Sequence, residues 1–245
     1  MNEQAHDEHL SYWTESRSLS LSVVTMLPLV VVYHLGIVQT GYQERLLAEL
    51  WLEGPLHLVG LHAAQIINFL LLVALILVLL RSDLKGSLSR LTIGIVMIAE
   101  AALYSLVLYR GGHVLTGLLY ERARSVIFTF HFSDYAPHCL ALGAGVYEEV
   151  LFRLLLLGGA SVLLASIFRW DKRLSTVVAL LFSSLLFAAV HNIGSLGEPF
   201  TAYNFLFRTV CGLALGVIYL GRGLGVAAWT HAIYNMLVLS GRLGA

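Results

Sequence analysis

The chain has 245 residues, of which 58% are hydrophobic and 12% are charged, and its formal net charge is zero. Soluble domains carry roughly 25% charged residues, and a chain of this length has too little interior to bury so much apolar surface. The composition therefore excludes an ordinary soluble domain, and the balanced charge offers nothing that would attract nucleic acid. Two cysteines in apolar stretches, Cys139 and Cys211, form no CxxC motif and indicate no disulfide framework.

Residues 1–17 form a polar N-terminal tail, which includes His6 and His9 and which we expect to be disordered. Its charges are mostly acidic, unlike the basic start of a secretory signal peptide. The apolar stretch that follows is longer than a signal-peptide core. We therefore interpret it as the first membrane span, with Pro28 as a predicted kink.

Seven stretches of the chain are long and apolar enough to cross a bilayer, which takes roughly 20 residues as a helix. They are residues 18–43, 57–80, 91–109, 135–168, 174–197, 199–219 and 224–241. In lipid a backbone must satisfy its own hydrogen bonds, so each span is predicted to be helical. The fourth stretch is long enough to tilt steeply or to break at Gly158-Gly159, which would make eight spans. The predicted fold is an all-α polytopic bundle.

The chain divides into the tail 1–17, an N-terminal region 18–134 and a C-terminal region 135–241 that contains the last four predicted spans. Within the N-terminal region, the mixed segment 111–134 is predicted to be an interfacial amphipathic helix or a re-entrant piece. Lys and Arg are more numerous in the loops that would be inside if the N-terminus were cytoplasmic, which favours that orientation.

Five charged side chains lie at span depth, where an ionised group costs at least a few kcal/mol and is a functional hypothesis by default. They are Glu100, Glu148, Glu149, Arg153 and Arg208. The i,i+4 spacing of Glu149 and Arg153 predicts an ion pair on one helix face. Glu148 is rotated by about 100° and can face elsewhere. The roles of Glu100 and Arg208 stay open: a pair between them across the bundle is one interpretation, and contact of Arg208 with a substrate carboxylate is a less favoured one.

Two later spans carry histidine motifs. His191 follows Phe187 by four residues, and Asn235 follows His231 by four, so each pair shares one helix face. Taken alone, each histidine is more simply a structural hydrogen bonder, and the acidic motif a buried ion pair. Taken together, a carboxylate and a histidine to activate water and two donors for an oxyanion suit acyl transfer to water.

The three motifs EEVLFR, FAAVH and HAIYN, read as EExxxR, FxxxH and HxxxN, occur in this order on successive apolar helices. In this order they resemble the CaaX-processing and bacteriocin-processing (CPBP, or Abi) family of intramembrane proteases. The resemblance covers about residues 135–241, the catalytic core of that family. Leu154 stands where the family usually has a small residue, which puts local packing in question more than catalysis.

The resemblance implies a catalytic set of Glu148, His191, His231 and Asn235. Glu148 would be the general base, and His191 would help to hold and polarise the water. His231 and Asn235 would stabilise the tetrahedral oxyanion. The supporting residues would be Glu149, Arg153 and Phe187.

Catalytic zinc bound by Glu148, His191 and His231 is the alternative, because histidine and carboxylate ligands suit it. The chain has no HExxH motif, and Asn is an uncommon zinc ligand, so we favour a mechanism without a cofactor. A non-enzymatic immunity or transport protein is the rival class. Transporters usually show interrupted spans in both halves, whereas here the polar residues crowd into the C-terminal half.

We therefore expect an intramembrane endopeptidase that cuts a membrane-associated protein or peptide. It would be a multi-pass protein of the plasma (inner) membrane of a prokaryote. Prenylated C-termini, bacteriocin precursors and C-terminal sorting tails remain open as substrates.

Overall fold

The computed structural model describes residues 12–39, 45–46, 48–52, 87–120, 136–193 and 199–243. All regular secondary structure in these ranges is helical. The elements are α2 (Leu19–Gln39), α5 (Ser87–Leu119), α6 (Ala136–Glu149), the π-helix η2 (Val150–Gly159), α7 (Ala160–Ser166), α8 (Lys172–Val190), α9 (Ala202–Arg222) and α10 (Leu224–Leu243). The predicted all-α membrane bundle is confirmed.

Within the described residues, five stretches meet the length and hydropathy of a membrane span: Leu19–Gln39, Arg90–Leu119, Pro137–Ser166, Lys172–Val190 and Ala202–Arg222. The apolar part of α10, Leu224–Ser240, is shorter. The predicted span 57–80 lies outside the described residues, so the count of seven is not confirmed. The predicted cytoplasmic N-terminus also stays a prediction.

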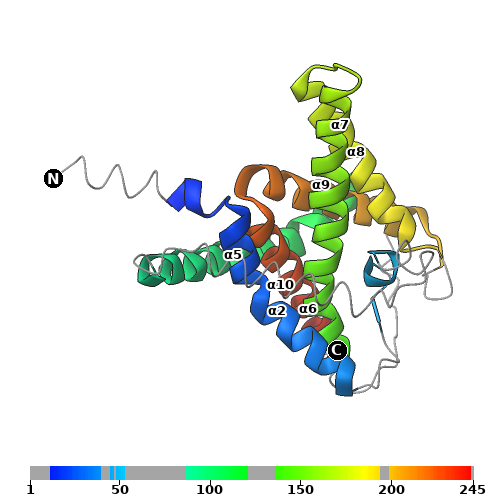
Figure 1. Cartoon of the computed structure of the whole chain (residues 1–245). Coiled ribbons are helices and arrows are strands. Elements are labelled where there is room, and N and C mark those ends of the chain that lie inside the picture. Colours follow the sequence, from blue (N-terminus) through cyan, green and yellow to red (C-terminus); the bar gives the residue numbers. More distant parts are fainter. Residues whose placement is uncertain are drawn as a thin grey trace, which may run out of the picture.

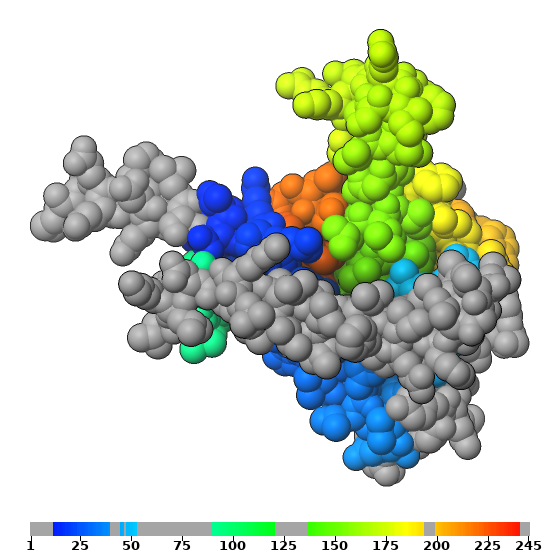
Figure 2. Space-filling view, viewed as in Figure 1, coloured from blue at the N-terminus to red at the C-terminus, as the bar shows by residue number. Residues whose placement is uncertain are grey.

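The fourth predicted span is one unbroken rod, so of the two alternatives for this stretch the break at Gly158-Gly159 does not occur. Residues 136–166 run through α6, η2 and α7, and Gly159 keeps right-handed helical angles, φ −62° and ψ −47°. A glycine pair permits a break but does not impose one. The α7 end of the rod and the start of α8 extend together beyond the rest of the bundle (Figures 1 and 2), and α7 exposes apolar side chains such as Leu163, as lipid contact requires.

The third predicted span is longer than expected, because α5 continues to Leu119. The first part of the predicted interfacial segment 111–134 is therefore a continuation of this helix, and residues 121–134 lie outside the described part. Gly111 and Gly112 do not end the helix, since tertiary packing outweighs their weak helix propensity. Phe207 of α9 packs there, 3.3 Å from where a Cβ atom of Gly112 would lie.

Helix α10 is the hub of the bundle and packs against α2, α5, α6 and α9 (Figure 1). Small residues bring it close to α6: a Cβ atom at Gly145 would lie 2.6 Å from the Ala228 carbonyl and 2.7 Å from the Ala232 Cβ. Such small-residue contacts let helix backbones approach in membranes, where no hydrophobic effect drives helices together. The close approach places the acidic end of α6 beside His231.

The interpretation that pairs Glu100 with Arg208 is wrong. Its carboxylate binds Arg222 in a two-pronged ion pair, with Nε 2.6 Å from Oε1 and Nη2 2.8 Å from Oε2. The hydroxyls of Tyr12 and Tyr104 donate to the same carboxylate at 2.6 and 2.7 Å. Arg222 is the last residue of α9 and lies beyond the stretch predicted as a span, so it was not among the charges expected at span depth.

The described end of the N-terminal tail is also ordered, against expectation. Arg222 donates to the Ser16 hydroxyl at 3.1 Å, and its guanidinium lies 3.9 Å from the Trp13 ring centroid. Ser16 is fully buried. Residues 12–17 are therefore held against the bundle, whereas His6 and His9 lie outside the described residues.

We predict that Arg222→Gln destabilises the protein strongly. Removing one partner of a buried ion pair leaves the other charge uncompensated, and about 3 kcal/mol is expected, the low end for such pairs because Glu100 is 16% exposed and keeps two tyrosine donors. Thermal unfolding in detergent measures the effect. Arg110→Gln, an exposed position on α5, is the matched control, and an equal Tm for the two variants would contradict the structural role.

Candidate active site

The acidic motif lies where α6 passes into η2. The Arg153 Nη1 lies 3.1 Å from Glu149 Oε1, and the two side chains are 1% and 0% exposed. This is the predicted i,i+4 ion pair. Because both charges are buried, the carboxylate and the guanidinium each need further hydrogen-bond partners from neighbouring helices.

The π-helical winding of η2 was not predicted. Ser183 of α8 donates to the Phe152 carbonyl at 2.6 Å, and Arg153 Nη2 donates to the Gly212 carbonyl of α9 at 3.3 Å. These bonds tie η2 to two neighbouring helices. Short π-helical segments are frequent at functional sites, and no residue pattern in the sequence marks this one.

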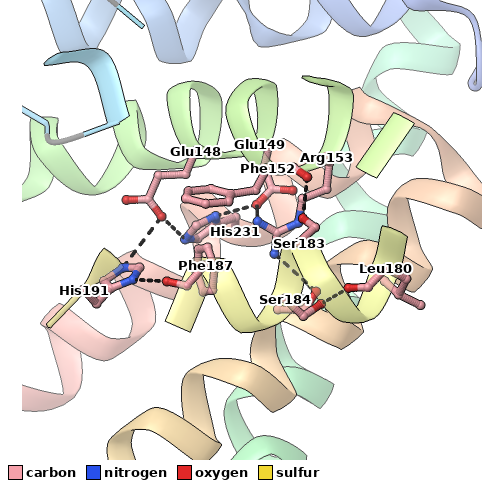
Figure 3. A network of polar contacts seen from close by, with 11 residues as sticks. Glu148, Glu149, Phe152, Arg153, Leu180, Ser183, Ser184, Phe187, His191 and His231 are labelled. Carbon is pink, nitrogen blue, oxygen red and sulfur yellow. Dashed lines mark hydrogen bonds and ion pairs between the residues drawn. The ribbon is translucent and has the colours of Figure 1, made fainter. Parts of the chain in front are cut away.

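His231 joins the acidic motif from α10. Its Nδ1 lies 2.8 Å from Glu149 Oε1 (Figure 3), and a carboxylate only accepts, so Nδ1 carries a hydrogen. The other ring nitrogen, Nε2, lies 3.8 Å from Glu148 Oε2. Glu149 therefore both pairs with Arg153 and orients the His231 ring, a contact that the sequence motifs did not indicate.

His191 is the C-cap residue of α8 and approaches Glu148 from the end of that helix. Its Nδ1 donates to the Phe187 carbonyl at 2.7 Å, which leaves Nε2 as the acceptor of a neutral ring. That Nε2 lies 3.9 Å from Glu148 Oε2. Phe187 packs against both histidines, with ring centroids 4.8 Å from His191 and 6.0 Å from His231, and so fixes their spacing.

Two of the predicted catalytic residues, His191 and His231, thus approach the same carboxylate oxygen of a third, Glu148 (Figure 3). The Glu148 Oε2 atom is buried and has no hydrogen-bond partner among the described residues. Separations of 3.8 and 3.9 Å to the two Nε2 atoms are too long for direct hydrogen bonds. One water molecule can bond two of these three atoms at once.

The structure places Asn235 at the edge of this group. It shares a face of α10 with His231, but its Nδ2 lies 3.5 Å from the Ala141 carbonyl of α6. This distance is at the long limit of a hydrogen bond, so the contact holds the amide weakly. Asn235 is one helical turn from His231, about 6 Å along the axis.

Arg208 also belongs to the surroundings of the site. It is half-buried on α9 and lies within Coulombic range of both the Glu148 carboxylate and the His191 ring. The sequence marked Arg208 only as a charge at span depth, and none of the three motifs connected it with Glu148.

No group of three or more His, Cys, Asp or Glu side chains in the described ranges is placed to hold a metal ion. Tetrahedral zinc ligands at about 2.0–2.2 Å from the metal lie roughly 3.3–3.6 Å from one another. The Glu148 oxygen lies farther from both histidine nitrogens, at 3.8 and 3.9 Å. As arranged, the Glu148 oxygen is farther from the two histidine nitrogens than two ligands of one zinc ion are from each other.

The comparisons with known proteins place this region in a family. A protein-family model described as "Type II CAAX prenyl endopeptidase Rce1-like" matches residues 137–237. No curated protein and no solved structure matches the chain. The matched segment contains all three motifs. The match supports the interpretation of the chain as an integral membrane protein and as an intramembrane protease of the CaaX type. Residues 137–237 are therefore a domain of the Rce1-like family, the CaaX-protease family that the motifs resemble.

Proposed function

We propose that the chain hydrolyses a peptide bond of a membrane-associated protein with a water molecule activated by Glu148 and His191, without a metal. The observation that carries the proposal is the position of Glu148 Oε2, 3.9 Å from His191 Nε2 and 3.8 Å from His231 Nε2. Protease membership of residues 137–237 supports the reaction class.

Water activation follows from the orientation of His191. The Phe187 carbonyl holds the hydrogen on Nδ1, so Nε2 can accept a hydrogen bond from water. The second hydrogen of that water points to the Glu148 carboxylate. As the water oxygen attacks the scissile carbonyl carbon, Glu148 takes this proton and the carbonyl π electrons move to oxygen, which becomes the oxyanion.

His231 and Asn235 stabilise the oxyanion with hydrogen bonds. The His231 Nδ1 is held by Glu149, which turns Nε2 toward Glu148, and an Nε2–H donates a hydrogen bond to the oxyanion. The Asn235 amide, on the same face, leaves its weak contact with Ala141 to donate the second bond. Glu148 then gives its proton to the leaving nitrogen, and the C–N bond breaks.

Glu148→Gln is expected to lower kcat by at least about a hundredfold, the low end of general-base contributions. The amide keeps the size of the side chain but takes no proton from water. Cleavage of a membrane-anchored peptide by purified protein measures kcat. The Tm in detergent should stay close to that of the wild type, and a variant that retains full activity would exclude Glu148 as the base.

Glu149→Gln is expected to lower the free energy of unfolding at least as much as it lowers activity. Its carboxylate is 0% exposed and binds both Arg153 and His231, so the amide leaves a buried arginine uncompensated, at about 3–5 kcal/mol. Thermal unfolding of both glutamate variants measures the difference. Equal and complete loss of folding in both would favour a purely structural charge network.

The metal-free mechanism predicts that the purified protein keeps its activity after exhaustive chelation and contains less than stoichiometric zinc by elemental analysis. A zinc enzyme would depend on metal occupancy. Stoichiometric zinc whose removal and return switch cleavage off and on would show that the proposal is wrong.

A further inference from the structure

The two ends of α8 differ in charge. The turn before the helix and its first residues carry three exposed basic side chains, Arg169, Lys172 and Arg173. The connection after the helix, residues 191–201, contains no Lys or Arg in its sequence. Basic residues in short loops collect on the cytoplasmic side of a membrane. The charges therefore favour a cytoplasmic position for the start of α8 and the opposite side for its end.

The register between α8 and α9 adds further basic residues to the same side. The two helices run antiparallel, because a Cβ atom at Gly212 would lie 3.1 Å from the Ser184 Cα and one at Gly216, a turn later, would meet the side chain of Leu180, a turn earlier. The end of α9, with Arg222, is thus level with the start of α8, and the start of α9 is level with the end of α8.

The exposed Arg17 of the N-terminal tail lies on this side too. Its Cα is 3.0 Å from where a Cβ atom of Gly223 would lie, directly after the end of α9. Basic residues from the tail, from the α7–α8 turn and from the end of α9 therefore share one side of the bundle.

Helix α8 has the length of one bilayer crossing. Its 19 residues span about 28 Å, close to the roughly 30 Å of hydrocarbon. Leu174, Val177, Leu181 and Leu185 recur every three or four residues and are each 47–52% exposed, so they form an apolar stripe along the helix. This stripe faces lipid, and His191 at the end of the helix lies near the far boundary of the membrane.

Aromatic side chains mark the two boundaries. Trp170 at the start of α8 and Trp13 of the tail are 43% and 47% exposed. At the start of α9, level with His191, Tyr203 packs against Tyr120 of the α5 end, with ring centroids 6.1 Å apart. Trp and Tyr are enriched at both membrane–water interfaces. The second aromatic group places His191 at the interface opposite to the basic side.

We propose that the active site opens at the extracytoplasmic face of the membrane and cleaves peptide bonds that have already been carried across it, an inference that rests on the proposed function. The Glu148 and His191 side chains, 15% and 21% exposed, receive water from that face. A peptide bond on the cytoplasmic side would have to cross the lipid to reach them. The substrate is a membrane-anchored protein with a translocated cleavage segment, so a translocation reaction must precede cleavage.

Cysteine labelling with a membrane-impermeant maleimide tests the orientation without using activity. Ile193→Cys, two residues after His191 and 53% exposed in the wild type, should react in right-side-out vesicles. Trp170→Cys should react only in inverted vesicles. The protein with its native cysteines alone gives the background. Ala202→Cys, exposed at the start of α9, replaces Ile193→Cys if that variant does not fold.

The opposite labelling pattern, or labelling of both ends of α8 from one side, overturns the proposal. Either result would place the basic turn and the site differently from the arrangement expected here.

Cleavage gives a second measurement that separates the two proposals. A membrane-anchored peptide added from outside should be cleaved by right-side-out vesicles, and by inverted vesicles only after detergent opens them. Vesicles with Glu148→Gln protein measure cleavage by other proteases. Cleavage by intact inverted vesicles overturns the extracytoplasmic site. If opened vesicles do not cleave either, the proposed function fails, and the labelling still decides the orientation.

Discussion

The buried carboxylate of Glu149 is the constraint on which the site depends. It is fully buried and binds Arg153 at 3.1 Å and His231 at 2.8 Å. An unpaired charge in this position would cost several kcal/mol, so the three side chains have to stay together. This requirement joins the α6–η2 rod to α10, and Arg153 extends it to α9 through the Gly212 carbonyl.

The same constraint sets the position of Glu148. Adjacent residues of a helix differ by about 100° in direction, so fixing Glu149 toward His231 and Arg153 turns Glu148 out of the ion-pair network. There its Oε2 faces the Nε2 atoms of both histidines. One glutamate thus stabilises the helix contacts, and its neighbour stays available for proton transfer. The second buried pair, Glu100 and Arg222, has a purely structural role: it holds residues 12–17 against the bundle.

The parts of this structure that follow from local periodicity could be predicted from the sequence. Composition and apolar stretch length fix an all-α bundle, and i,i+4 spacing fixes the Glu149–Arg153 pair. Partner choice between distant helices could not be predicted in this way. Glu100 binds Arg222 rather than Arg208 because the end of α9 packs beside α5, and that proximity belongs to tertiary structure. The π-helical η2 is likewise bound to distant helices, through the hydrogen bond that it accepts from Ser183 of α8 and the one that its Arg153 donates to α9.

An experimental structure of the protein with a bound peptide phosphinate, which mimics the tetrahedral intermediate, would show the roles of the four side chains in one experiment. We predict that one phosphinate oxygen lies within hydrogen-bond distance of Glu148 and the His191 Nε2. We predict that the other oxygen faces His231 and Asn235, with the Asn235 amide turned away from Ala141. A phosphinate bound to a metal ion, or bound away from Glu148, would exclude the proposed mechanism.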